Sequence, residues 1–581
     1  MNLVASDVAF GYPGHAVFEH LDFRVSRGMR IGVVGENGTG KSTLLALLAG
    51  SLQPSKGSIK RKGSLAIVEQ ELDTVPGQTI GDLVQSALRE VRQVAAELEA
   101  AAERLQSESS GCKTENNAVI LRQGADATQN AESRAEIDAE NEQLANLLAR
   151  AEQLRSWDAD RRLDEALTRL GAPRDLERPM ATLSVGERYR VRLACRLAES
   201  ADFLLLDEPT NHLDQAAIEY LTAQLLRWPG GVVLVTHDRE LLDDVATAIF
   251  DLNPSIDCRP VLYGKPGYES YRRAKDAALR RWRSRYVREQ KRLAELALTL
   301  DSSYEGLSDE WRPPKGSQKH RRGTRARQHV KAADRQILQL GATAVDIPEP
   351  PLELNFPALP TVDLPATTPL KPQAPALISV NEPLVLGDAG KARLDLTGQV
   401  INIEPGGRLL VVGPNGSGKS TLLKVLGGQL KLNGGTRAAI SNIRYGIVGQ
   451  ENAKLVTAGI DEAKITGFEA IQNEVLELLS RGQLDPDNLN PVLDLGLLTE
   501  AELDKPLKDL SAGQRRRFEL ARVLVTAPQL LILDEPTNHL SIDLVDTLTK
   551  ALDKTEAAVI IATHDRRMRQ DLADWPTLEL E

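Results

Sequence analysis

The chain repeats the same four motifs, in the same order, in its two halves. The first-half motifs are GENGTGKST at Gly35–Thr43, LSVGE at Leu183–Glu187, LLLDEPTNHLD at Leu204–Asp214 and VTHDR at Val235–Arg239. Their second-half partners are GPNGSGKST at Gly413–Thr421, LSAGQ at Leu510–Gln514, LILDEPTNHLS at Leu531–Ser541 and ATHDR at Ala562–Arg566. In both halves the serine of the second motif precedes the first aspartate of the third by 23 residues, and that aspartate precedes the histidine of the fourth by 30. Such equal spacing implies that one fold is used twice.

At 581 residues the chain is too long for a single hydrophobic core, so several domains are expected. The repeat predicts a first nucleotide-binding domain over residues 1–255 and a second over 377–581. A basic helical hairpin is expected at 256–345 and a Pro-rich connector at 346–376.

The first half carries an insertion that the second half lacks. From Gln70 to the LSVGE motif is 113 residues, whereas from Gln450 to the LSAGQ motif is 60. The insertion falls within residues 84–170, and its flanks at Val84–Leu105 and Ala131–Leu170 are rich in helix-forming residues. Gln106–Asn130 between them is polar and predicts a loop. We therefore expect a helical arm in the first domain.

A long amphipathic pattern lies between the two halves. Apolar residues recur at three- and four-residue steps from Tyr271 to Leu300, and again from Ala326 to Leu340. The two stripes predict helices that are joined by Asp301–Lys319 and pack as an antiparallel hairpin. The Pro-rich stretch Ile347–Pro375 predicts an extended connector.

Charge is distributed very unevenly along the chain. The net charge is −11, yet residues 271–340 hold 19 Lys and Arg against 8 Asp and Glu. A basic segment in an otherwise acidic chain indicates contact with a polyanion. The alternative is a solvated helix face.

The composition excludes several classes of protein. The three cysteines are far apart in the sequence, which argues against a disulfide framework, a zinc site or an iron–sulfur cluster. The first residues lack the basic and apolar pattern of a signal peptide. Apolar runs are of strand length, shorter than the roughly 20 residues that a membrane helix needs. A cytoplasmic protein without a membrane span is expected.

The first repeated motif has the form GxxxxGK[ST], and each copy stands between an apolar strand and a Leu-rich helix. Its glycines allow backbone N–H groups to surround phosphates at a helix N-terminus. The lysines would neutralise the β- and γ-phosphates of ATP, and the serines after them would hold Mg²⁺. The predicted ATP-binding residues are Gly35, Asn37, Gly38, Gly40, Lys41, Ser42 and Thr43 in the first copy, and Gly413, Asn415, Gly416, Gly418, Lys419, Ser420 and Thr421 in the second.

The third motif places two carboxylates after an apolar strand. Asp207 and Asp534 are expected at Mg²⁺, which they would reach through its water shell. Glu208 and Glu535 would polarise the attacking water, because that task needs an acceptor near the γ-phosphate. These two glutamates are the predicted catalytic residues, together with the histidines of the fourth motif.

Those histidines, His237 and His564, each follow a short β-branched strand. A single histidine at such a place is more often structural, but repetition at equal spacing favours contact with the γ-phosphate. Gln70 and Gln450 each end an apolar strand and fit a contact with Mg²⁺ or the attacking water.

Together these motifs resemble the ATP-binding-cassette (ABC) superfamily. The resemblance implies an α/β fold with two P-loop ABC ATPase domains in tandem, which hydrolyse ATP to ADP and phosphate. In that family the LSxG[EQ] signature of one half completes the ATP site of the other. Ser511 and Gly513 would therefore join the first P-loop, and Ser184 and Gly186 the second.

The resemblance also assigns a role to Tyr12 in FGYPG, which stands where the family stacks an aromatic ring on adenine. The corresponding stretch of the second half, Leu384–Leu396, contains no aromatic residue. This departure predicts a looser hold on the base at the second site, or a wider choice of nucleotide.

Within the superfamily the chain is most similar to the F subfamily of translation-associated ATPases. The features that carry this are tandem cassettes without membrane helices, DEPTNHL after both acidic pairs, and the basic hairpin. The resemblance implies a monomer that binds the ribosomal E site, with the hairpin near rRNA or tRNA and the arm on the large subunit. Tyr304 and Trp311 near the hairpin tip would touch RNA or, alternatively, cap the hairpin's own core.

Several functions fit these expectations. Members of the subfamily act as general translation factors or dislodge antibiotics from the ribosome, and the divergent, Ala-rich arm favours the second role here. The ATPase subunit of a membrane exporter is an alternative, although the basic hairpin has no evident task there. A cassette ATPase of DNA repair is a further alternative, but such proteins usually carry zinc motifs or long coiled coils.

Overall fold

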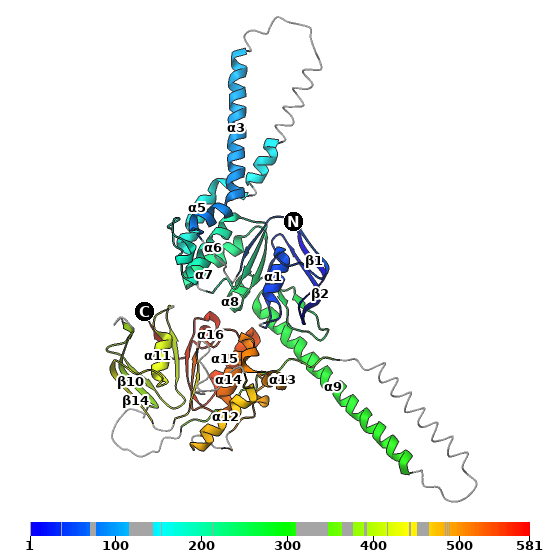
Figure 1. Cartoon of the computed structure of the whole chain (residues 1–581), viewed down its shortest axis with the longest axis vertical. Helices are drawn as coiled ribbons and strands as arrows, with labels where there is room; N and C mark the ends of the chain where they lie inside the picture. The colour runs from blue at the N-terminus through cyan, green and yellow to red at the C-terminus, as the bar shows by residue number, and fades with distance from the viewer. Residues whose placement is uncertain are drawn as a thin grey trace, which may run out of the picture.

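The computed structural model describes residues 2–36, 38–69, 77–115, 143–152, 154–211, 213–309, 347–362, 376–387, 392–414, 416–440, 443–449, 464–482, 484, 486 and 489–580. Within the helices of these ranges, the side chains of 103–115 and of most residues from 296 to 309 are not described. Two α/β cassettes lie against each other, and long helices project from them in different directions (Figure 1).

The first cassette is built on a mostly parallel six-stranded sheet in the order β5-β6-β7-β3-β8-β9. Its strands are β3 (Arg30–Val34), β5 (Leu65–Val68), β6 (Phe203–Asp207), β7 (Gly231–Val235), β8 (Ala248–Asp251) and β9 (Val261–Tyr263). Every residue of β6 and β7 is buried, which explains their unbroken apolar runs, because a parallel sheet is covered on both faces. A smaller antiparallel sheet in the order β2-β1-β4 joins β1 (Asn2–Tyr12), β2 (His15–Ser26) and β4 (Lys56–Lys62).

Helices cover both faces of the large sheet. One core cluster contains Leu44 and Leu48 of α1, and a second contains Leu193 of α6 and Leu221 of α7. The helices of this cassette outside the arm are α1 (Lys41–Ala49), α5 (Ala159–Arg169), α6 (Val185–Glu199), α7 (Gln215–Arg227) and α8 (Arg239–Val245).

The second cassette repeats this architecture. Its five-stranded parallel sheet has the order β15-β16-β17-β13-β18, with β13 (Arg408–Val412), β15 (Tyr445–Val448), β16 (Leu530–Asp534), β17 (Ala558–Ala562) and β18 (Thr577–Glu579). In the antiparallel sheet, β10 (Ile378–Leu386) pairs with β11 (Ala392–Asp395), β12 (Val400–Ile403) and β14 (Gly434–Ala439). The helices are α11 (Lys419–Leu426), α12 (Gly467–Ser480), α13 (Glu500–Leu503), α14 (Ala512–Val525), α15 (Ile542–Lys554) and α16 (Arg566–Asp571). The α/β fold with two tandem cassettes is therefore confirmed.

The arm starts with α2 (Ile80–Ala87), which has a capping box at Thr79, and continues as α3 (Arg89–Glu115). Figure 1 shows α3 projecting from the first cassette. The loop expected from Gln106 is wrong as far as Glu115, because the helix continues through these polar residues. Residues 116–142 lie outside the described part of the chain, and the chain is helical again from residue 143 to 152.

The hairpin segment begins with α9 (Tyr268–Asp309), a single helix of 42 residues. The helix runs past Asp301, where a loop was expected. Ser302–Asp309 contains no proline and only one glycine, Gly306, so nothing in this stretch ends the helix. The second expected helix at Ala326–Leu340 lies outside the described residues, as does Trp311. The first cassette also extends beyond residue 255, its expected end. Strand β9 (Val261–Tyr263) pairs with β8 and so belongs to the sheet of this cassette.

The described part of the connector, 347–362, packs on the second cassette and on α9. Leu354 and Leu359 join the core of that cassette, and Trp282 Nε1 of α9 donates a hydrogen bond to Pro348 O at 2.8 Å. Arg283 of α9 and Glu353 form an ion pair with atoms 2.5 Å apart. Although extended, this segment ties the root of α9 to the second cassette.

Candidate ATP sites

The first phosphate loop lies between β3 and α1. Gly40 is the N-cap of α1 with φ 95°, and a Cβ added there would lie 2.5 Å from Val17 Cγ1 and 2.6 Å from the Phe18 ring. Only glycine fits this conformation and this space. Lys41 Nζ donates to Gly35 O at 2.8 Å and Glu36 O at 3.3 Å. The ammonium group is thus held inside the loop, where a phosphate would meet it.

The carboxylates at the end of β6 face this loop. Ser42 Oγ donates to Asp207 Oδ2 at 2.7 Å, which brings together two of the residues expected at Mg²⁺. Burial raises the pKa of Asp207, although Ser42 and Lys41 oppose the rise. The next residue, Glu208, has φ 47° and accepts a hydrogen bond from the backbone N–H of His237 at 3.3 Å.

The second phosphate loop has the same geometry. Gly418 is the N-cap of α11 with φ 95°, and Lys419 Nζ donates to Gly413 O at 2.8 Å and Pro414 O at 3.0 Å. Burial raises the pKa of Asp534, and its hydrogen bond with Ser420 opposes the rise. Both loops therefore hold the predicted lysine, serine and aspartate together.

The predicted catalytic glutamates and histidines differ between the two sites. Burial raises the pKa of Glu208 to about 8, and burial together with Lys41 and His539 lowers the pKa of His237 to about 3. His237 is thus neutral near pH 7, and its 3.4 Å contact with Glu208 is not an ion pair. In the second cassette, the hydrogen bond with Glu535 raises the pKa of His564, whose Nδ1 lies 2.8 Å from Glu535 Oε2.

The difference follows from exposure. The His237 side chain is 26% exposed and that of His564 56% exposed. His539, which belongs to the second cassette, is close enough to His237 to lower its pKa. The first site is covered by the opposite cassette, and this loss of water disfavours the protonated form of its histidine.

Two buried carboxylate oxygens suit an additional ligand. Glu208 Oε1 and Asp534 Oδ1 are buried and accept no hydrogen bond from the described residues. Buried acceptors usually have a donor or cation as a partner. Together with Ser42 and Ser420, they fit a hydrated divalent cation and an attacking water molecule beside the phosphates.

The signature serines cap helices. Ser184 is the N-cap of α6 and Ser511 the N-cap of α14, and each forms a capping box with the residue three positions later, Glu187 or Gln514. Gly186 and Gly513 lie in the first turns. Each signature thus presents a helix N-terminus, which favours phosphate binding through free N–H groups and the helix dipole.

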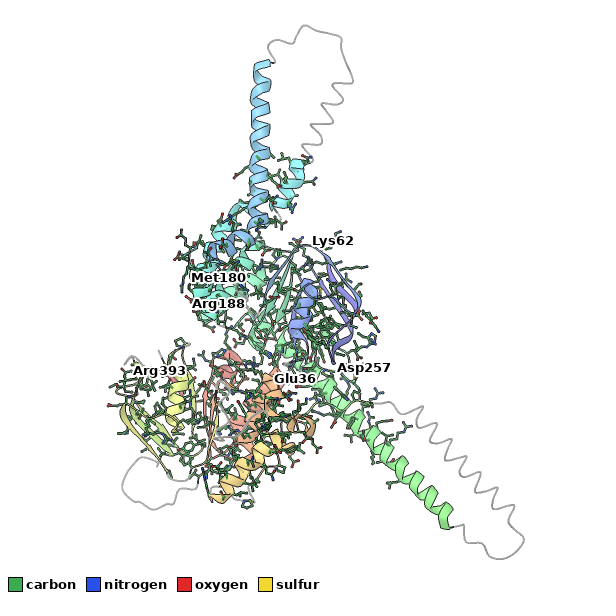
Figure 2. All side chains as sticks on the ribbon, viewed as in Figure 1. Glu36, Lys62, Met180, Arg188, Asp257 and Arg393 are labelled. Carbon is green, nitrogen blue, oxygen red and sulfur yellow. The ribbon has the colours of Figure 1, made fainter. Side chains whose placement is uncertain are left out.

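One signature lies against the phosphate loop of the other cassette. Gly513, Gln514, Arg517, His539 and Ser541 of the second cassette line a narrow crevice with Glu36 of the first. Arg517 Nη2 lies 3.8 Å from Glu36 Oε2. Figure 2 places Glu36 at the junction of the two cassettes, and Arg393, beside the second loop, on another flank. The first composite site, between the Lys41 loop and the Ser511 signature, is thus partly assembled.

Comparison with known proteins agrees with this geometry. The model of the ABC transporter family matches residues 18–211 and 396–538. The tylosin resistance ATP-binding protein TlrC of Streptomyces fradiae is 34% identical over 570 residues, which cover 96% of this chain and 93% of TlrC. ABC transporter F family member 4 of Arabidopsis thaliana is 30% identical, over 96% of this chain and 70% of the relative. The chain is an ABC ATPase of the F subfamily.

A further relative is the energy-dependent translational throttle protein EttA of Mycobacterium tuberculosis, 29% identical over 93% of this chain and 84% of EttA. As an ABC-F ATPase, the chain binds ATP and hydrolyses it to ADP and phosphate. Among the described residues, no helix is both long and apolar enough to cross a bilayer.

The region expected to meet adenine differs between the two ABC-F cassettes. Tyr12 is 51% exposed at the end of β1 and packs edge-on against Phe10, with ring centroids 5.3 Å apart. In β10 the left-handed residue Glu382 corresponds to Asp7 of β1, so Gly387 takes the place of Tyr12. A Cβ on Gly387 would lie 3.0 Å from Arg393 Nε and 3.2 Å from Arg393 Cγ. An arginine side chain therefore covers the place where the first cassette has its tyrosine.

Four of the predicted site residues, Asn37, Gln70, Asn415 and Gln450, lie outside the described residues. Other contributors could not be recognised from the motifs alone. Arg516 is 6% exposed, and its Nη2 donates to Asp534 O at 2.8 Å and Glu535 O at 3.0 Å. The first cassette has Tyr189 at the equivalent position, five residues after its signature serine. The difference between Tyr189 and Arg516 at equivalent positions of the repeat is the sequence signal that could have identified Arg516.

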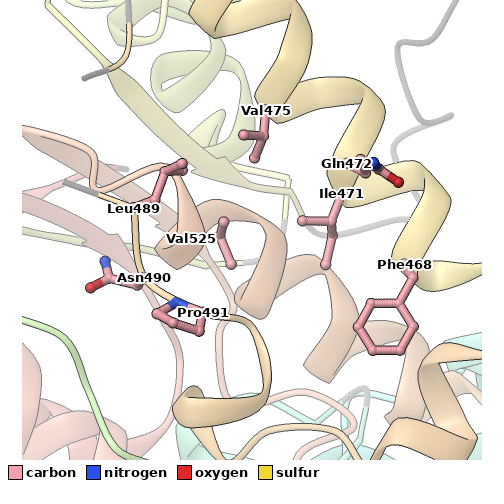
Figure 3. Close-up of a pocket in the computed structure, with 8 residues that line it drawn as sticks. All are labelled: Phe468, Ile471, Gln472, Val475, Leu489, Asn490, Pro491 and Val525. Atoms are coloured by element: carbon pink, nitrogen blue, oxygen red, sulfur yellow. The ribbon is translucent and has the colours of Figure 1, made fainter. Parts of the chain in front are cut away.

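An apolar pocket of about 330 Å³ lies away from the phosphate loops, between α12, residues 489–491 and α14 (Figure 3). Phe468, Ile471 and Val475 of α12 line one side and Val525 of α14 another. It contains no charged side chain, so it does not suit a nucleotide.

Proposed function

We propose that this ABC-F ATPase binds the ribosomal E site under control of ATP and protects the ribosome against antibiotics. The observation that carries the proposal is the exposed basic surface of α9. Arg280, Arg281, Arg285, Arg288, Lys291 and Arg292 are exposed along this helix. Such a row of cations on a projecting helix favours contact with nucleic-acid phosphates.

Antibiotic protection is favoured by the relatives. TlrC carries tylosin resistance in its name, and its similarity covers 93% of its length at 34% identity. EttA, named as a translational throttle, is 29% identical over 84% of its length. A general translation factor is therefore the second candidate. An exporter ATPase subunit is less favoured because the basic surface of α9 would then have no ligand.

In the proposed reaction, the residues of each site act on ATP in fixed roles. Lys41 and Lys419 bind the β- and γ-phosphates, while Ser42 with Asp207 and Ser420 with Asp534 would hold Mg²⁺. When bound, Mg²⁺ would offset the negative charge of the phosphates. In their ionised forms, Glu208 and Glu535 accept the proton of the attacking water. The loops of His237 and His564 orient these two carboxylates. Gln70 and Gln450 are proposed to contact Mg²⁺ or that water, and Tyr12 to stack on adenine.

The proposed switch is the closing of the two cassettes around ATP. The Ser511 signature would bind the γ-phosphate at the first site and the Ser184 signature at the second. Because these contacts need the γ-phosphate, ATP favours the closed state more than ADP does, and hydrolysis allows reopening. The closed state would hold α9 in the ribosome-binding position, with its tip near rRNA or tRNA.

Sedimentation with 70S ribosomes tests this proposal. The double variant Glu208→Gln, Glu535→Gln should lose hydrolysis by a factor of about 10² to 10⁴ and remain on ribosomes in ATP, because the closed state cannot reopen. The matched control Glu219→Gln, Glu500→Gln changes two exposed glutamates and should behave as wild type. A double variant that sediments free of ribosomes in ATP would contradict the proposal.

Translation assays then separate protection from a general role. Wild-type protein should restore translation in extracts inhibited by a ribosome-binding antibiotic, while uninhibited extracts change little. Equal effects with and without the drug would favour the general translation factor.

A further inference from the structure

A buried cluster of charges lies at the root of α9, where the helix meets both cassettes. This root cluster contains Arg239 and Asp251 of the first cassette, Tyr268, Tyr271, Arg272 and Lys275 of α9, and Asp543, Asp546 and Asp565 of the second cassette.

Lys275 is the central cation of this cluster. Its Nζ lies 2.9 Å from Asp251 Oδ2 and 2.5 Å from Asp543 Oδ2, and it donates a hydrogen bond to Tyr271 Oη at 2.9 Å. The Lys275 side chain is 8% exposed. Burial lowers the pKa of Lys275, but Asp251 and Asp543 raise it by more than burial lowers it, so the amine stays charged. One side chain of α9 thus binds a carboxylate from each cassette.

Asp546 extends the cluster along α15. It accepts a hydrogen bond from Tyr268 Oη at 3.0 Å and pairs with Arg272 Nε at 3.2 Å. It also pairs with Arg239 of the first cassette, whose Nη2 lies 3.0 Å from Asp565 Oδ1. The second turn of α15 is therefore fixed to α9 and to the first cassette.

The N-terminus of α15 lies in the first composite site. Its N-cap, Ser541, lines the crevice with Glu36 and Gly513, two residues before Asp543. On the other side of the site, the loop of His237 continues through Asp238, the N-cap of α8, into Arg239. On both sides of the first ATP site, a residue of the site thus lies only two positions before a residue of the root cluster.

We propose that Lys275 and Asp543 are positioning residues for ATP hydrolysis at the first composite site. By tying the start of α15 to α9, they set where Ser541 stands beside the nucleotide. The same link acts in both directions, because a coupling free energy between two sites is reciprocal: closure around ATP turns α9, and a load on α9 shifts Ser541. The inference rests on the proposed composite site and does not depend on ribosome binding.

Turnover at each site separately tests the positioning role in the full-length chain. In a Glu535→Gln background, which leaves the first site active, Lys275→Met and Asp543→Asn should lower kcat at least fivefold and change KM for ATP less than twofold. In a Glu208→Gln background, which reports the second site, they should lower kcat less than twofold. Lys550→Met, an exposed change on α15, the helix that carries Asp543, is the matched control. A loss of equal size at both sites, or none at the first, would overturn the proposal.

Fluorescence energy transfer tests the link without turnover. Dyes on Arg292→Cys of α9 and Lys62→Cys of β4, in a chain with Cys112→Ser, Cys258→Ser, Glu208→Gln and Glu535→Gln, should give different efficiencies in ATP and ADP. Lys275→Met should reduce that difference by at least half, and Lys550→Met should keep it. The proposal is overturned if the parent shows no difference or if Lys275→Met keeps all of it. Neither experiment contains ribosomes, so a failure of ribosome binding is recognised separately.

Discussion

At the scale of single residues, the two sites carry the same motifs in different surroundings. His237 is covered by the opposite cassette and has a lowered pKa, while His564 is more exposed and hydrogen-bonded to Glu535. Tyr12 has an exposed ring at the first site, and Arg393 covers Gly387 at the second. The two places proposed to meet the base therefore differ, with an exposed aromatic ring at the first site and a guanidinium group at the second.

Replacing Tyr12 tests the aromatic face. In a Lys419→Ala background, which removes the main phosphate contact of the second site, Tyr12→Ala should weaken ATP binding roughly tenfold, because stacking of a base on a ring contributes about 1–3 kcal/mol. Tyr12→Phe keeps the ring and should bind like the parent. Titration calorimetry with ATP measures both, and an unchanged affinity of the alanine variant would contradict the stacking role.

At the scale of elements, the strands and helices that carry the phosphate chemistry could be predicted, because their motifs stand at the strand–loop–helix junctions that phosphate binding requires. The root of α9 could not. Periodicity placed Tyr271 and Trp282 in a hairpin seam, whereas they are buried against the cassettes and the connector. A helical stripe identifies a buried face but not its partner, and Lys275, a charged residue, gave no apolar signal at all.

Helix α14 begins at the signature of the second cassette. Its residue Arg516 bonds the backbone of Asp534 and Glu535, where β16 of the same cassette ends. Arg516→Met should destabilise that cassette by about 3 kcal/mol, because two buried carbonyls lose charged hydrogen-bond donors. Turnover at the second site, measured in a Glu208→Gln background, should fall roughly tenfold or more as Glu535 loses its position. Thermal melting and steady-state kinetics check the two effects. Arg569→Met, an exposed change on α16 of the same cassette, is the control and should change neither.

At the scale of the whole molecule, positive charge is concentrated on α9 while the chain as a whole is acidic, with a net charge of −11. This separation limits nonspecific contact of the cassettes with RNA and directs attraction to the projecting helix. The arm projects elsewhere (Figure 1), so contacts of the two projections can be varied independently.

The triple variant Arg281→Gln, Arg285→Gln, Arg288→Gln should weaken ribosome binding and reduce the slope of log affinity against log salt concentration by about three, one for each lost phosphate contact. Arg24→Gln, Arg61→Gln, Arg227→Gln removes the same charge from exposed positions on the first cassette and should leave the slope unchanged. Sedimentation at several salt concentrations measures both, and equal slopes for the two triple variants would argue against α9 as the contact.

The length of α9 has a mechanical consequence. A helix of 42 residues extends about 63 Å, and its root is clamped by residues from both cassettes. A rotation of only about 5° at the clamp moves the far end by roughly 5 Å over that length. α9 therefore acts as a lever that pivots at Lys275. Small substitutions around Lys275 can change the direction of the tip although no residue of the tip itself is altered. The position of the tip can therefore change through substitutions near Lys275, while the cassettes and the residues of the ATP sites stay unchanged.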